Sequence, residues 1–186
     1  MGDSGSVGAV ASIAVYPVKS LGGHTVPAVS VGTGGLAGDR VHFVVDATTG
    51  ERVTARTTPR MREVVATGDV ERDTVALSQV LGRPVRLAGA GTGPQVDAAP
   101  VHLVSRAAID HAAAGEVPEG CSADDPRANL LLELSGGADE RSWVGRRVQV
   151  GEVVLDVVRT PRHCLGVYAE VVVPGRVAAG DAVRLC

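Results

Sequence analysis

Short valine-rich runs separated by glycines dominate the 186-residue sequence and limit the folds open to it. Runs of β-branched residues are typical of strands, and glycine supplies the turns between them. Many short strands with few helices indicate a barrel or a strongly bent sheet. The predicted strands are residues 10–16, 26–31, 41–46, 51–56, 101–104, 129–134, 148–150, 153–158, 167–173 and 182–185.

Two segments depart from this pattern and predict short helices. Residues 75–81 have apolar positions three and four apart and end at Gly82, a natural helix stop. Ser105 follows a predicted strand, where its hydroxyl would cap a helix that runs through Ala113. A glycine-rich linker at residues 89–94 divides the chain into predicted domains of residues 1–90 and 95–186. The predicted fold class is mixed α/β but predominantly β.

The composition excludes several classes of partner. A net charge of −3 without any basic run argues against nucleic acid. No apolar segment approaches the roughly 20 residues of a membrane span, and the first residues lack a secretory signal. We therefore expect a cytoplasmic protein with no membrane partner. The three cysteines are too widely spaced for a disulfide framework or a zinc knuckle, and we expect reduced thiols.

Two features of the sequence invite a functional interpretation that their context does not support. Residues 32–37 match the dinucleotide fingerprint G-x-G-x-x-A, but a strand follows where a phosphate-binding helix should begin. His102 lies in an apolar strand, so we expect a core histidine with a hydrogen-bonded ring.

Cys164 is the cysteine with the most suggestive surroundings. It lies in a loop between two apolar strands, next to Arg159, Arg162 and His163. Neighbouring cations favour the thiolate, which is the form that ligates metals and attacks electrophiles. A buried, inert cysteine explains the position equally well. Cys121 and Cys186 are expected to be inert.

Basic and amide residues stand at several predicted strand ends. Strand ends that face one cleft could clamp a phosphate or carboxylate, although scattered surface charge explains the spacing more simply. Lys19 is the only lysine and Asn129 the only asparagine of the chain. This rarity suggests that the two residues are kept for a function. The residues concerned are Lys19, Ser20, Arg40, Arg127 and Asn129.

An ordered set of motifs resembles the MOSC-domain family of molybdenum-cofactor proteins, together with the β-barrel domain that precedes the MOSC domain. Each motif is weak alone, but the set covers nearly the whole chain in the right order. The motifs are VYPVKS at 15–20, GLAGDR at 35–40, VVD at 44–46, TPR at 58–60, LSQVLGRPVRL at 77–87, PVHLVS at 100–105, DPRANL at 125–130, WVG at 143–145 and RTPRHC at 159–164.

The resemblance implies a MOSC-type β-barrel, a small N-terminal β-rich domain and a molybdenum cofactor (molybdopterin with molybdenum). Cys164 would be the catalytic residue and the metal ligand, as in the reductases of the family. The residues that would hold the pterin and its phosphate are Lys19, Ser20, Arg40, Ser105, Arg127, Asn129 and Arg162. The chain departs from the family in two places. Residues 62–77 are shortened, which could demand a dimer, and Arg162 replaces a small polar residue.

The activity that follows is an oxidoreductase, independent of pyridoxal phosphate, that reduces N-hydroxylated or N-oxide substrates. Electrons would come from a separate donor protein, because the chain has no cysteine set for an iron–sulfur cluster. Two alternatives remain open: a cofactor carrier without turnover, and a sulfur-transfer protein that uses a Cys164 persulfide.

Overall fold

The computed structural model describes residues 5–89, 99–117, 126–162 and 165–186, and the chain separates into two compact units. The first unit contains residues 1–14, 26–37 and 98–186; the second contains residues 15–25 and 38–97. Each unit is therefore built from segments that are distant in sequence. The predicted domain boundary falls in residues 90–98, which lie outside the described residues.

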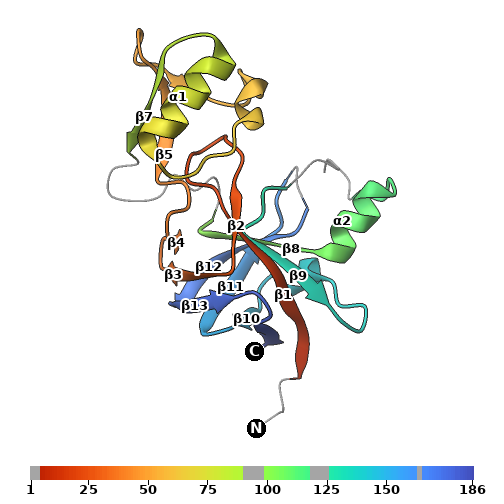
Figure 1. Ribbon diagram of the computed structural model, residues 1–186. Helices are drawn as coiled ribbons and strands as arrows, with labels where there is room; N and C mark the ends of the chain where they lie inside the picture. Colours follow the sequence, from red (N-terminus) through yellow and green to blue (C-terminus); the bar gives the residue numbers. More distant parts are fainter. Residues whose placement is uncertain (1–4, 90–98, 118–125, 163–164) are drawn as a thin grey trace. The chain divides into compact units, whose positions relative to one another are not determined.

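A closed barrel of seven strands forms the centre of the first unit (Figure 1). The strands follow the order β14-β10-β11-β12-β8-β9-β1, and pairing of β14 with β1 closes the circle. β11 shows why the sequence suits a barrel: Val153, Leu155 and Val157 are buried, while residues between them are half-buried. The bounds are β1 Ser6–Val15, β8 Val101–Ser105, β9 Leu130–Leu134, β10 Arg147–Val150, β11 Val153–Arg159, β12 Val167–Val173 and β14 Ala182–Leu185.

β8 and β9 are the parallel pair of the barrel, and helix α2 (Arg106–Ala113) follows β8. Parallel neighbours require a crossover connection, and α2 lies within that connection. The Ser105 hydroxyl accepts a hydrogen bond from the Ala108 amide at 3.1 Å, so the predicted helix cap is confirmed.

A smaller antiparallel sheet in the first unit joins β3 (Ala28–Gly32), β4 (Gly35–Leu36) and β13 (Gly175–Ala178). The predicted strand 26–31 is interrupted at Pro27, since β2 (His24–Val26) ends before it. Proline has no amide hydrogen to donate to a ladder. The glycine-rich residues 32–37 form the β3–β4 hairpin, so the prediction that they do not open a helix is confirmed.

In the second unit, helix α1 (Val70–Leu81) packs against a three-stranded sheet (Figure 1). The strands of this sheet are β5 (His42–Asp46), β6 (Arg52–Val53) and β7 (Val85–Gly89). A 3-10 turn, η1, spans Pro59–Glu63. The helix starts five residues before the predicted residue 75, because Asp69 caps it by accepting from the Arg72 amide. It ends at Gly82, as predicted. The core of this unit gathers Val18, Leu21, Val44, Val53, Met61, Val64, Ala66, Leu77 and Val85.

The prediction of a mainly β fold with few short helices is confirmed. None of the helices in the described part of the chain is long and apolar enough to cross a membrane.

Candidate functional site

Three predicted cofactor residues come together in the second unit. The segment that carries Lys19 and Ser20 runs beside the segment that carries Arg40. The Arg40 amide donates to the Tyr16 carbonyl at 2.7 Å, and the Lys19 amide donates to the His42 carbonyl at 2.9 Å. Backbone pairing between residues 16–19 and 40–42 thus gathers the basic residues of two motifs.

Unusual backbone conformation marks three of the predicted residues. Ser20 has φ 77°, Arg40 has φ 50° and Arg127 has φ 52°. In the residues that the structure describes, these are the non-glycine residues with positive φ. Each conformation of this kind costs about 1 kcal/mol or more, and such residues cluster at functional sites.

The Arg40 side chain is almost fully buried, and its neighbours hold the guanidinium in place. Its guanidinium forms an ion pair with the Asp39 carboxylate and lies over the Tyr16 ring, 5.2 Å from the ring centroid. The other oxygen of Asp39 accepts from the Tyr16 amide at 2.8 Å. Asp39 and Tyr16 therefore fix the direction of Arg40. Sequence reasoning placed both within motifs but assigned them no role.

Asn129 and His102 connect strands of the barrel. The Asn129 side chain is buried; its oxygen accepts from the His102 amide at 3.2 Å, and its nitrogen donates to the Ala14 carbonyl at 3.3 Å. The His102 ring is bonded to the Leu165 carbonyl at 2.8 Å, which confirms the prediction of a core histidine. Asn129 thus has a structural role in the barrel. Its cofactor role remains a prediction.

Ser105 occupies a similar structural position at the end of β8. Its hydroxyl caps α2, and its amide donates to the buried Glu140 carboxylate at 3.1 Å. Glu140 belongs to the short 3-10 turn η2 (Glu140–Trp143). Sequence reasoning missed Glu140, because only the tertiary fold brings η2 to the end of β8.

The remaining predicted site residues differ in their exposure, and some lie outside the described residues. Arg127 is half-buried in the segment that leads into β9, and Arg162 is exposed after β11. Cys164, His163 and Cys121 lie outside the described residues, while Cys186 is a free, exposed thiol. Within the described ranges, no cluster of three histidine, cysteine, aspartate or glutamate side chains could hold a metal ion.

Comparisons with known proteins place these residues in a family. The sequence model described as the MOSC N-terminal beta barrel domain matches residues 7–116, a range that includes Lys19, Ser20, Arg40 and Ser105. Among solved structures, the YuaD protein from Bacillus subtilis is similar to this chain with a TM-score of 0.54. The match covers 96% of this chain and 94% of that chain at 14% identity, so it shows a shared fold. No curated protein matches the sequence.

Proposed function

The chain belongs to the family of the MOSC N-terminal beta barrel domain, which is linked to molybdenum-cofactor binding, and from this premise we propose a molybdenum-cofactor protein. Its activity in this proposal is the reduction of N-hydroxylated or N-oxide substrates. The observation that carries the proposal is the positive φ of Ser20, Arg40 and Arg127. All three belong to the seven cofactor residues that the resemblance implies.

The strain supports a ligand role because glycine would adopt the same conformation at little cost. A chain that keeps serine or arginine there gives up stability, and a need for the side chain explains why. Arginine and lysine are the side chains that bind phosphate best, and Arg40 is already oriented by Asp39 and Tyr16. The donor set therefore fits the anionic pterin phosphate.

Each residue has a distinct part in this proposal. Lys19 would supply a positive charge and Ser20 a hydroxyl, while Arg40 and Arg127 would each donate hydrogen bonds to anionic oxygens of the cofactor. Further contacts would come from Ser105, Asn129 and Arg162. Cys164 would bind the metal as a soft thiolate ligand. The cofactor would supply the two-electron chemistry that removes oxygen from the substrate.

The decisive measurement is the molybdenum and pterin content per chain after expression in a host that makes the cofactor. Lys19→Ala and Arg127→Ala should each reduce the pterin content about tenfold, because each removes a charged phosphate contact. Arg60→Ala is the matched control, since Arg60 is exposed and pairs only with the surface residue Glu63 among the described residues. Full pterin content in both site variants would contradict the proposed clamp.

Cys164→Ala separates the metal role from the pterin role. We expect this variant to lose molybdenum and the reduction of an N-hydroxylated test compound by a chemical electron donor, while it keeps pterin. A wild-type protein that binds the cofactor stoichiometrically but reduces no such compound would be a carrier. A protein with neither metal nor pterin but with a persulfide at Cys164 would be a sulfur-transfer protein.

A further inference from the structure

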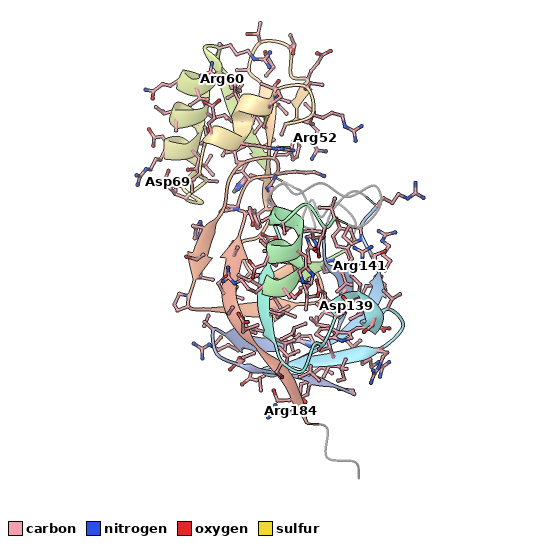
Figure 2. The ribbon with its side chains drawn as sticks, turned by 90° about the vertical axis from the view of Figure 1, so that its right-hand side faces the viewer. Arg52, Arg60, Asp69, Asp139, Arg141 and Arg184 are labelled. Atoms are coloured by element: carbon pink, nitrogen blue, oxygen red, sulfur yellow. The ribbon has the colours of Figure 1, made fainter. Side chains whose placement is uncertain are left out.

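A cavity of about 320 Å³ opens in the first unit, beside α2 and the turn η2. Figure 2 shows Asp139 and Arg141 on this side of the unit, next to α2. Its volume lies at the lower end of the range of small-molecule pockets, which is about 300–1,000 Å³. The residues that shape it include Ser105, Ala108, His111, Ala138, Arg141 and Leu165.

Arg141 gives the cavity its chemical preference. Its Nη1 atom is buried and has no hydrogen-bond partner in the part of the chain that the structure describes. A buried cationic donor without an acceptor is costly, and an anion in the cavity would remove that cost. Guanidinium and carboxylate groups match in geometry as well as in charge. The cavity is therefore suited to a ligand that carries a carboxylate.

The acidic residues of the lining do not cancel this preference. The Asp139 carboxylate accepts from the Arg141 amide at 2.9 Å, so it is engaged as the cap of η2. Glu116 is exposed at the rim, where water screens its charge. His111, which also lines the cavity, is exposed as well.

The rest of the lining is small and apolar. Ala107 and Ala108 come from the first turn of α2, Ala138 precedes η2, and Leu165 is buried against α2. Alanine side chains leave the space open, and Leu165 offers an apolar wall. This surface would bury the hydrocarbon part of a ligand at about 25 cal/mol per Å² of apolar area removed from water.

We propose that this cavity binds a small organic carboxylate with an apolar body the size of a single ring. Arg141 donates to a carboxylate oxygen, and the body packs against Ala108, Ala138 and Leu165. The inference goes beyond the proposed cofactor role. Ser105 belongs to both sets of residues, but the contacts that carry this inference are those of Arg141, Ala108, Ala138 and Leu165.

Benzoate is the probe for this site, with benzamide as its neutral isostere and benzamidine as its cationic counterpart. Titration of the full-length protein, followed by amide NMR shifts, should move the signals of Ala108, Ala138 and Leu165. We expect benzoate to bind about tenfold more tightly than benzamide, as a charged hydrogen bond predicts. Equal affinity for the two, tighter binding of benzamidine, or no saturable shift would overturn the proposal.

Arg141→Gln tests the assigned contact, with Arg146→Gln as the control because Arg146 is exposed and outside the lining. The first should weaken benzoate binding about tenfold and leave benzamide unchanged, whereas the second should change neither. Ala107→Phe fills the cavity without altering Arg141 and should abolish binding, which keeps the test available if Arg141→Gln does not fold. Unchanged benzoate affinity in a folded Arg141→Gln or Ala107→Phe variant would refute the site.

Discussion

Both units contain left-handed backbone, at glycines and at other residues, and the reasons for it differ between positions. In the first unit, Gly35, Gly151 and Gly166 have positive φ where an added Cβ would collide with neighbouring atoms. In the second unit, Ser20 and Arg40 keep their side chains at positive φ. Packing therefore explains the glycines, whereas a requirement for the side chain itself explains Ser20 and Arg40.

Buried polar groups show the same contrast. In the first unit, the side chains of Asn129, His102 and Glu140 bond to backbone groups of neighbouring strands and turns. In the second unit, Asp39 positions the guanidinium of Arg40 as well as bonding to backbone. The comparison teaches that burial alone does not identify a ligand-binding residue; the groups that the side chain contacts must also be known.

The largest expected effect tests the packing explanation for the barrel glycines. Gly166→Ala would set a methyl group against the Leu103 carbonyl at φ 80°, so we expect a loss of about 4 kcal/mol in unfolding free energy. Gly180→Ala is the control: φ is 90°, but no heavy atom lies within 4 Å of the added Cβ. It should lose about 1 kcal/mol. Urea unfolding measures the loss of unfolding free energy in both variants. Equal losses would show that backbone strain alone, and not the collision with Leu103, causes the loss.

The next effect tests the structural role of Asn129. Asn129→Ala leaves the His102 amide and the Ala14 carbonyl without their side-chain partner inside the barrel, so we expect a loss of about 3 kcal/mol. Arg162→Ala, at an exposed predicted cofactor residue, should change stability by less than about 0.5 kcal/mol. A stable Asn129→Ala protein that lacks cofactor would reverse our interpretation of this residue.

A smaller effect, of opposite sign, tests the interpretation of the strained loops. Ser20→Gly should raise the unfolding free energy by about 1 kcal/mol, because glycine tolerates φ 77°, while it lowers cofactor content. Ser135→Gly, at a position without positive φ, should instead lower stability by about 0.5 kcal/mol. Ser20→Gly with unchanged stability and unchanged cofactor content would remove the distinction between the two regions.

The smallest expected effect is on the pH dependence of stability, and it concerns Asp46, which shapes a turn in the second unit. Hydrogen bonds from the Thr49 and Thr48 amides, with a further contribution from Arg83, lower the pKa of Asp46. Its folded pKa is below its unfolded value, so its stabilising contribution is complete above a pH of about 4 and is lost as pH falls through the folded pKa.

Asp46→Asn should therefore lower stability at neutral pH and reduce the further loss of stability on acidification below pH about 4. Urea midpoints at a series of pH values measure this difference. Asp110→Asn is the control, because Asp110 is exposed on α2. An acid dependence in Asp46→Asn that equals that of the wild type would show that other carboxylates are responsible.

Local signals in the sequence determined the fold class and several element ends. Valine-rich runs and glycines predicted the strands of the barrel but not β7 or β13. Ser105 predicted the start of α2 and Gly82 the end of α1, because these depend on neighbouring residues only. The ordered motifs likewise include Ser20, Arg40 and Arg127 among the predicted cofactor residues.

Only the tertiary structure decided the features that join distant segments. Pairing of β1 with β14 closes the barrel between the two ends of the chain, and no local periodicity specifies such a partner. The stacking of Arg40 on the Tyr16 ring, the strand contacts of Asn129 and the cavity at Arg141 have the same origin. Each depends on which segments the fold brings into contact, since hydrogen bonds and packing act over distance in space rather than separation in sequence.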